Sequence, residues 1–195
     1  MKYFLDTEFI EGFHKPLFGK RRHFIDLISI GIVAEDGREY YAVSTDFKPK
    51  DANDWVKRNV FPKLQTRFAL WPDDPPHMHA ETLLWKSNTC IKEELLSFFG
   101  CYEDHLFWRA PDGIEVYGYF ADYDWVLFCS LFGNMMDLPK GFPMYCRDLK
   151  QMLDDSGVGE KLRGALPPQQ DEHNALSDAK WNKQLYEVII KTETK

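Results

Sequence analysis

The stretch KYFLDTEF, residues 2–9, decides the fold because it combines a run of large apolar side chains with two acidic ones. An apolar run of this kind is typical of a strand that is buried on both faces. Residues i and i+2 of a strand point to the same face, so Asp6 and Glu8 aim their carboxylates at one place. An edge strand with a solvated polar face would also carry such a pair, and this alternative stays open here.

Two carboxylates on one face of a central strand repel each other unless a cation lies between them. At a separation of about 4 Å and an effective dielectric constant near 20, the repulsion is roughly 4 kcal/mol. A divalent cation turns this repulsion into attraction. Asp6 and Glu8 are therefore candidate metal ligands.

The rest of the chain predicts a mixed α/β sheet in one domain spanning residues 1–195. Strands are expected at 25–34, 38–45 and 114–120, with a hairpin turn at 35–37. Helices are expected at 51–60, 88–99, 122–132, 147–156 and 174–190, and a proline-rich loop at 71–80. Asp51 or Asp54 is the expected cap of the first helix. A hairpin-rich opening followed by alternating helices and strands favours the α/β class.

The segment FADYDWVLF, residues 120–128, holds a second candidate carboxylate. Asp122 is well placed to cap the helix that starts there, which is the common use of an aspartate at this position. Asp124 shares its helix face with three apolar residues within about 60°, namely Leu127, Phe128 and Leu131. A carboxylate on an apolar face is costly unless a cation shares the cost. We therefore predict Asp124 as the site residue and Asp122 as the cap.

The segment HNALSDA, residues 173–179, holds a third carboxylate and a histidine. Asp178 lies within roughly 80° of the apolar face formed by Trp181, Leu185, Val188 and Ile189. A buried ion pair is the alternative explanation for such an aspartate. His173 would be about 140° away if the helix included it, so it reaches the same place only from the loop before the helix. Asn174 suits the N-cap, which puts His173 on that loop.

Composition restricts the classes of function. Hydrophobic content of 44% and charged content of 28% describe an ordinary soluble globular protein. The net charge is −7, so a surface that binds nucleic acid must be local. The absence of a signal sequence and of an 18-residue apolar run predicts a cytoplasmic protein without a membrane partner. The four cysteines have no CxxC spacing and are expected to be reduced core thiols rather than disulfides or zinc ligands.

The three acidic segments together resemble the DEDDh, or DnaQ-like, 3′–5′ exonuclease superfamily. The matching motifs are DTE at 6–8, YD at 123–124 and HxAxxD at 173–178. Within that superfamily the chain is similar to RNase AS, the polyadenylate-specific 3′-exoribonuclease family. The similarity includes YFLDTEFIE and LISIGIVAEDGREYYAVST and covers most of the chain, least so between about 50 and 112. DxE and HxAxxD in this order form a specific combination, whereas either motif alone would be weak.

Two features depart from the family pattern. Many members carry asparagine four residues before the middle aspartate, and here that position is Phe120. This departure bears on how the second metal would be positioned. The segment 12–24, GFHKPLFGKRRHF, is longer than the pattern leads us to expect, and an added loop that contacts the substrate would explain it.

The resemblance implies an RNase H-like fold, with a mixed five-stranded sheet flanked by helices, and two Mg²⁺ or Mn²⁺ ions per active site. By the same resemblance Asp6 would hold both ions. Glu8 and Asp178 would hold the first ion, and Asp124 would support the second. Two ions about 3.5–4 Å apart clamp the attacking and leaving oxygens of an in-line phosphoryl displacement. His173 would be the general base, a task suited to an imidazole with a pKa near 6.5, roughly its unperturbed value.

The implied activity is the removal of nucleoside 5′-monophosphates from the 3′ end of single-stranded RNA, with A-rich or poly(A) ends as candidate substrates, by a homodimer. Phe9 and Ile10 follow the DxE motif and would lie against the terminal nucleotide, although Phe9 could equally be a core side chain. Lys20, Arg21 and Arg22 could grip phosphates or form a solvated loop. Lys161 and Arg163 could serve in the same way.

Two rival functions remain at this point. A DNA-directed 3′–5′ exonuclease of the same superfamily would carry the same motifs, because backbone groups can recognise the 2′-hydroxyl that distinguishes RNA. A catalytically silent nucleic-acid-binding module would explain a charged surface, but it has no need for His173.

Overall fold

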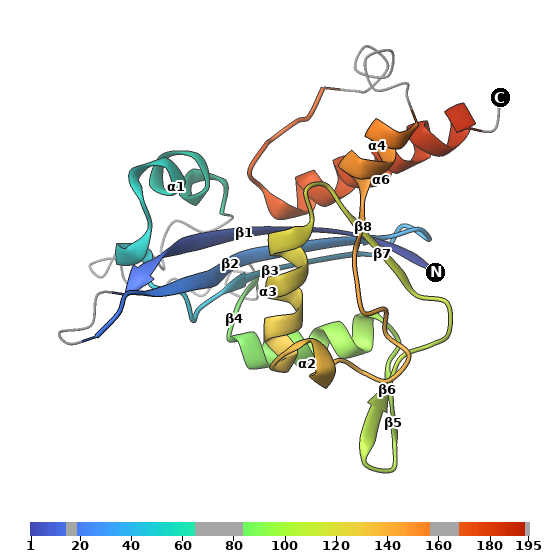
Figure 1. Cartoon of the computed structure of the whole chain (residues 1–195), viewed down its shortest axis with the longest axis horizontal. Coiled ribbons are helices and arrows are strands. Elements are labelled where there is room, and N and C mark those ends of the chain that lie inside the picture. The colour runs from blue at the N-terminus through green and yellow to red at the C-terminus, as the bar shows by residue number, and fades with distance from the viewer. Residues whose placement is uncertain (15–18, 65–83, 157–167, 194–195) are drawn as a thin grey trace.

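A mixed six-stranded sheet forms the centre of the computed structural model (Figure 1), which describes residues 1–14, 19–64, 84–156 and 168–193. The strand order is β4-β3-β2-β1-β7-β8. β1 pairs with β2 and β2 with β3 in antiparallel fashion, whereas β3–β4, β1–β7 and β7–β8 are parallel. The strands are β1 (Lys2–His14), β2 (Arg22–Ala34), β3 (Glu39–Ser44), β4 (Trp85–Lys86), β7 (Glu115–Gly118) and β8 (Arg147–Asp148).

The remaining elements surround this sheet. The α-helices are α1 (Asp54–Asn59), α2 (Asn88–Phe98), α3 (Asp122–Phe132), α4 (Leu149–Asp155) and α6 (Ala175–Glu193). The short 3-10 helices are η1 (Pro49–Asp51), η2 (Phe61–Lys63) and η5 (Met135–Asp137). A separate two-stranded hairpin consists of β5 (Tyr102–Asp104) and β6 (Phe107–Arg109).

Helices cover both faces of the sheet (Figure 1). One core layer packs β1 and β2 against α2 and α3, with Leu5, Leu95 and Phe128 at 0% exposure. On the opposite face, α6 and α4 pack on β1 and β7 through residues such as Leu185 and Leu149. α1 and η2 pack near the other end of that face. The apolar run of β1 is therefore buried on both faces, as its sequence predicts.

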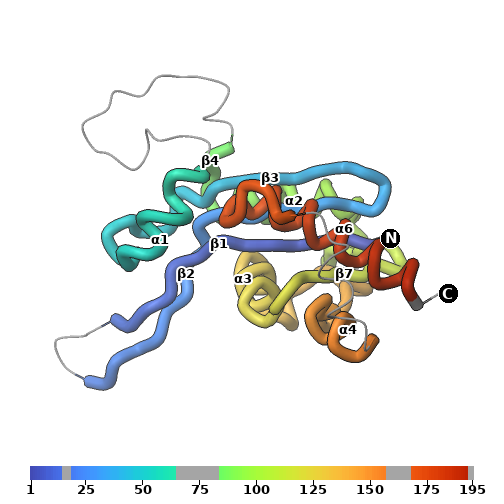
Figure 2. The backbone as a smooth tube through the Cα atoms, turned by 90° about the horizontal axis from the view of Figure 1, so that it is seen from above, coloured from blue at the N-terminus to red at the C-terminus, as the bar shows by residue number. Residues whose placement is uncertain are grey.

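The two central strands, β1 and β2, continue beyond the sheet as a long two-stranded ribbon (Figure 2). Past Ile10 the two strands stay paired, with Glu11 opposite Ile25 and His14 opposite Arg22. We call residues 11–14 and 19–25 the arm. Within the arm the rings of His14 and Phe24 stack with centroids 4.3 Å apart. The unusually long segment noted in the sequence therefore forms, in its described part, an extension of the two central strands.

The structure confirms the α/β class but corrects the strand count. The sheet has six strands rather than five: four longer strands, and the two-residue strands β4 and β8 at its edges. The predicted cap of α1 was also wrong, since Asn53 is the N-cap and its side chain accepts a hydrogen bond from Val56 N. The predicted loop at 71–80, together with Lys161 and Arg163, lies outside the described residues.

Two further expectations concern thiols and membranes. All four cysteines are free, as predicted, but Cys90 is exposed rather than in the core, whereas Cys129 is buried. Among the described residues, no helix is long and apolar enough to cross a membrane.

Candidate active site

The site forms beside the part of β1 that lies beyond its pairing with β7. There the backbone of β1 makes hydrogen bonds with side chains of two helices instead of with a neighbouring strand. β7 pairs with β1 from Lys2 to Phe4. Beyond that point the carbonyl oxygen of Leu5 accepts a hydrogen bond from Asn182 Nδ2 of α6 at 3.0 Å. The next free backbone donor, Thr7 N, donates to Asp124 Oδ1 of α3 at 2.9 Å. The edge of β1 therefore holds both helices beside Asp6 and Glu8.

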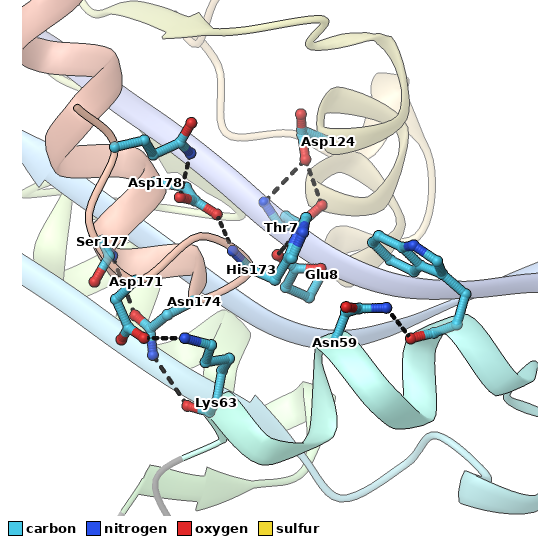
Figure 3. A network of polar contacts seen from close by, with 12 residues as sticks. Thr7, Glu8, Asn59, Lys63, Asp124, Asp171, His173, Asn174, Ser177 and Asp178 are labelled. Atoms are coloured by element: carbon cyan, nitrogen blue, oxygen red, sulfur yellow. Dashed lines mark hydrogen bonds and ion pairs between the residues drawn. The ribbon is translucent and has the colours of Figure 1, made fainter.

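Asp124 is fixed by Thr7 in two ways (Figure 3), because both the backbone N–H and the hydroxyl of Thr7 donate to its Oδ1, at 2.9 and 2.5 Å. Asp124 is buried, whereas Asp122 is exposed. The prediction from helical periodicity that Asp124, rather than Asp122, lies on the buried face is therefore confirmed. The predicted cap was wrong, because Ala121 occupies the N-cap and Asp122 lies in the first turn. The backbone N–H of Ala121 instead donates to Asp148 Oδ2 at 2.8 Å.

Gly31 lets α6 approach the sheet directly beside Asp6. Gly31 pairs with Asp6 across β1 and β2. A Cβ at this position would lie 2.2 Å from the carbonyl oxygen of Ala175, which is closer than real Cβ atoms come. Asn174 begins this helix as predicted, because its Oδ1 accepts a hydrogen bond from Ser177 N at 3.1 Å. The contact brings Asp178, in the first turn of α6, over β1.

Asp178 and His173 are held together by a short loop before α6 (Figure 3). His173 N donates to Asp178 Oδ2 at 2.9 Å, and Gln169 Nε2 donates to Asp178 Oδ1 at 2.5 Å. His173 Nδ1 lies 3.9 Å from Glu8 Oε1. One ligand atom from each of Glu8, His173 and Asp178 can be chosen so that all lie within 4.8 Å of one another. His173 therefore occupies the loop position that the sequence predicts.

The pKa values of the four carboxylates are all raised, and for Asp6 and Glu8 the neighbouring carboxylates of the cluster are among the causes. Burial is the largest cause for Asp6, whose pKa lies well above its usual range, and Asp124, Asp178 and Glu8 add to it. Burial, then Asp178 and Asp124, raises the pKa of Glu8 to about 8. Burial also raises the pKa of Asp124 to about 7, against the two hydrogen bonds from Thr7. The pKa of Asp178 is raised by burial and lowered in part by Gln169 and His173. The carboxylates thus form one interacting cluster.

The cluster suits a hard divalent cation. Mg²⁺ and Mn²⁺ prefer oxygen ligands, and buried carboxylates are stable when they coordinate a metal. Glu8 and Asp178 offer oxygens on one side of β1, while Asp6 is coupled electrostatically to both of them and to Asp124. The oxygen donors of Glu8 and Asp178 therefore suit such an ion chemically, and His173, the predicted base, completes the group whose ligand atoms lie within 4.8 Å of one another.

The predicted substrate-binding residues do not all occupy the same environment. Phe9 is partly buried and its ring stacks on Tyr123 at 5.3 Å between centroids. Ile10 is 1% exposed and belongs to the core, so its side chain offers no surface to a nucleotide. Lys20, Arg21 and Arg22 are exposed, the first two at the tip of the arm and Arg22 at the start of β2. A register shift between Glu8 and Phe9 separates the acidic part of β1 from the arm.

Several residues at the site were not identified from the sequence. Thr7 and Gln169 donate to the carboxylates, and Trp55 places its ring edge-to-face with His173 at 4.8 Å. Only Thr7 carried a signal, since it stands between Asp6 and Glu8 in the motif. Gln169 and Trp55 lie in segments whose patterns predict a loop and a surface helix.

An α/β sheet whose central strand gathers four carboxylates and a histidine is the kind of site that metal-dependent phosphodiester hydrolases use. Comparison with known proteins narrows this class. The family model for the 3′–5′ exoribonuclease Rv2179c-like domain matches residues 1–190. The chain belongs to that family, and it is an enzyme of the nuclease class.

Two named relatives come from Mycobacterium tuberculosis. They are the 3′–5′ exoribonuclease Rv2179c of strain ATCC 25618 / H37Rv and the 3′–5′ exoribonuclease MT2234.1 of strain CDC 1551 / Oshkosh. Each is 39% identical to this chain over 194 residues, which cover 99% of this chain and 95% of the relative. The alignment thus includes every segment that contributes to the candidate site.

Proposed function

We propose that the protein is a DEDDh-type 3′–5′ exoribonuclease with an RNase H-like fold that depends on two Mg²⁺ or Mn²⁺ ions. Its substrate is single-stranded RNA, with A-rich or poly(A) 3′ ends as the first candidates, and its products are nucleoside 5′-monophosphates. The observation that supports the proposal is the cluster of Asp6, Glu8, Asp124 and Asp178 beside His173, in which ligand atoms of Glu8, His173 and Asp178 lie within 4.8 Å of one another.

The carboxylates would hold the ions. Asp6 would contact both, Glu8 and Asp178 the first, and Asp124 the second. When bound, the ions supply charge stabilisation to the attacking and leaving oxygens of the scissile phosphodiester. Thr7 fixes Asp124, and Gln169 with His173 N fixes Asp178, so the protein holds these ligands in place through hydrogen bonds.

His173 would act as the general base. Its imidazole takes a proton from the attacking water, whose oxygen forms a bond to the phosphorus of the last phosphodiester. The bond from phosphorus to the 3′-oxygen of the penultimate nucleotide breaks, and that oxygen takes up a proton from solvent. The terminal nucleotide leaves as a 5′-monophosphate. The alternative role for His173 is to bind a metal through the ring nitrogen that lies near Glu8 and Asp178. The His173→Ala variant distinguishes these two roles.

Substrate would be held along two surfaces. The partly exposed ring of Phe9, stacked on Tyr123, lies next to the acidic part of β1 and offers a flat surface to a base. Stacking of a base on an aromatic side chain contributes about 1–3 kcal/mol and tolerates every base. The arm would then hold upstream phosphates through Lys20, Arg21 and Arg22.

The deciding experiment is a time course on matched 5′-labelled RNA and DNA oligomers with Mg²⁺, with Mn²⁺ and with EDTA. The proposal expects single-nucleotide shortening of RNA from the 3′ end, faster on A-rich ends, and none with EDTA. Equal or faster shortening of DNA would favour the DNA-directed alternative. Binding without shortening of either oligomer would favour the silent module.

The role of His173 has its own test. We expect His173→Ala to reduce turnover by about 10²–10⁴, the usual range for loss of a general base. The Mn²⁺-induced rise in melting temperature should change little, because the carboxylates remain. A large loss of that metal response would identify His173 as a ligand, and full activity would remove it from the mechanism.

A further inference from the structure

We infer that Trp55 and Lys63, which we call the bracket, position His173 for its role as the base. The inference rests on the proposed function in one respect, because the proposed function makes His173 the general base. Trp55 belongs to α1 and Lys63 ends η2, so both come from one segment that the catalytic motifs do not include. Among the described residues, the ring of Trp55 meets His173 and the ammonium group of Lys63 meets Asp171, so both act on the His173 loop rather than on the carboxylate cluster.

The loop that carries His173 has a backbone that needs support. Asp171 has φ of 58° and His173 has φ of 68°, both in the left-handed region. Residues other than glycine adopt this conformation rarely, and it persists where surrounding contacts determine it. This loop therefore has two residues in a disfavoured backbone conformation within three positions.

Contacts from the bracket reach this loop at three points. Lys63 Nζ lies 2.5 Å from Asp171 Oδ1 (Figure 3). The carbonyl oxygen of Lys63 accepts a hydrogen bond from Asn174 Nδ2 at 3.2 Å. The rings of Trp55 and His173 meet edge-to-face, with centroids 4.8 Å apart and planes at 76°. The bracket therefore touches the residues on both sides of His173 and the imidazole itself.

The segment that carries the bracket is itself anchored. Asn53 caps α1, and the Asn59 side chain donates to the carbonyl oxygen of Trp55 at 2.8 Å. Val56, Val60 and Phe61 are buried in the core beneath it. A reactive side chain is held most accurately by groups on such packed elements. The packing of α1 and η2 thus fixes the position of the bracket, and the bracket can in turn fix the orientation of the imidazole.

Trp55 is 50% exposed, which is a large apolar surface to leave in water. A ring in this place could instead stack on a base of the substrate. The two roles differ in what they change. A positioning residue acts through His173 and lowers kcat, whereas a stacking surface raises KM and acts whether or not His173 is present.

A double-mutant cycle separates these roles. In the full chain with Mg²⁺, we expect Trp55→Ala to lower kcat about tenfold and to leave KM within about twofold, since small misplacement of a reacting group is costly. Lys63→Met should lower kcat about threefold, and Lys63→Arg should restore it. In the His173→Ala background, Trp55→Ala should cause no further loss. Lys57→Ala, an exposed change on the same helix, is the matched control and should leave kcat unchanged.

NMR of the imidazole provides a second readout that does not need activity. The His173 ring signals, assigned as those missing from His173→Ala, should shift in Trp55→Ala because the indole ring current is lost. They should stay nearer to their wild-type positions in Trp55→Phe, which keeps an aromatic ring and guards against a misfolded variant, and they should not move in Lys57→Ala.

Each outcome decides the inference. Two results would refute the positioning role of the bracket. One is that the His173 signals do not move in Trp55→Ala. The other is that Trp55→Ala causes the same loss of kcat in the His173→Ala background as in the wild type. A rise in KM alone would make Trp55 a stacking surface. Full activity of His173→Ala would refute its role as base, which belongs to the proposed function, and the NMR comparison would still decide whether Trp55 fixes the ring.

Discussion

Gly31 is the residue on which the approach of α6 to the sheet depends. It faces Asp6 on the neighbouring strand, and a Cβ would meet the backbone of Ala175 at 2.2 Å. Backbone cannot move aside as a flexible side chain can, so we expect Gly31→Ala to cost about 1–3 kcal/mol of stability, the range for overpacking. Urea unfolding measures this change. The same variant should weaken the Mn²⁺-induced rise in melting temperature, because Asp178 moves with α6. An unchanged midpoint and metal response would contradict this account.

The carboxylate cluster makes the metal-free protein sensitive to pH. Burial raises the pKa of Glu8 to about 8 and that of Asp124 to about 7. Both values exceed those of an unfolded chain, roughly 4.3 and 3.9, so the folded state binds the protons more tightly. The stability from these protons is complete below about pH 4 and is lost as the pH rises through 7 to 8. We therefore expect the melting temperature in EDTA to fall from pH 5 to pH 9.

The measurement is thermal unfolding at each pH, in EDTA and in Mn²⁺. Glu8→Gln should reduce the fall in EDTA, because it removes one of the carboxylates whose pKa is raised in the folded state. Mn²⁺ should oppose the fall, since it binds the ionised cluster and stabilises the folded state by mass action. Identical pH dependence in wild type and Glu8→Gln would show that Glu8 does not titrate as described. A metal response unchanged in Asp6→Asn, Asp124→Asn and Asp178→Asn alike would refute the ligand assignment.

At the scale of elements, periodicity predicted the longer helices well. The interval from Asp122 to Phe132 was predicted with both of its ends, because Gly133, at φ of 124°, ends the helix. The same periodicity placed Asp124 and Asp178 on buried faces. These predictions succeed because a packed helix repeats its apolar face over several turns, which a local pattern records.

Short strands and contacts between distant residues could not be predicted from local sequence patterns. β4 and β8 have two residues each, too few to show alternation, and neighbouring strands create them. The β5–β6 hairpin was not predicted; its strands have three residues each, and they leave Tyr102 and Phe107 exposed. Asn182 was missed as the donor to Leu5 because 177 positions separate them. Such contacts depend on the fold as a whole, and no local pattern specifies them.

The arm is the element whose role in substrate binding can be measured directly. Lys20, Arg21 and Arg22 are exposed on the arm, which extends from the sheet on the opposite side from the C-terminal end of α6 (Figure 2). If they grip phosphates, changing all three to alanine should weaken RNA binding and reduce the slope of log affinity against log salt by roughly 0.7 for each lost contact. Binding is followed by fluorescence anisotropy in EDTA, which prevents hydrolysis, on a long oligomer and on a dinucleotide.

The control for the arm removes the same charge elsewhere. Changing Lys92, Lys140 and Lys191 to alanine lowers the net charge equally but leaves the arm intact. We expect this variant to keep the wild-type slope, and the arm variant to lose affinity for the long oligomer more than for the dinucleotide. Identical slopes for wild type and the arm variant on both lengths would show that the basic run is a solvated loop.

At the scale of the whole molecule, the net charge of the protein has the same sign as that of the proposed RNA substrate. The chain has a net charge of −7 and its site gathers four carboxylates, so a polyanion is repelled by the molecule as a whole. Under the proposed function, cations held by the cluster and the basic residues of the arm would be the local features that offset this repulsion. Affinity for RNA should therefore depend on both metal and salt, and the two dependences should come from different ends of β1.

The last prediction concerns assembly. Similarity to RNase AS implies a homodimer, and the described surface has large exposed apolar side chains, among them Leu106 at 88% and Met136 at 76%. Exposed apolar area of this kind is what association removes from water, although single exposed residues also occur on monomers. The protomer has a mass of 23.0 kDa, so light scattering at micromolar concentration should report about twice that mass. The value should hold on tenfold dilution if the contact is tight, and should fall smoothly toward one protomer if it is weak. A particle of one protomer at every concentration tested would refute the dimer, and the exposed apolar side chains would then be single exposed residues of the kind that monomers also carry.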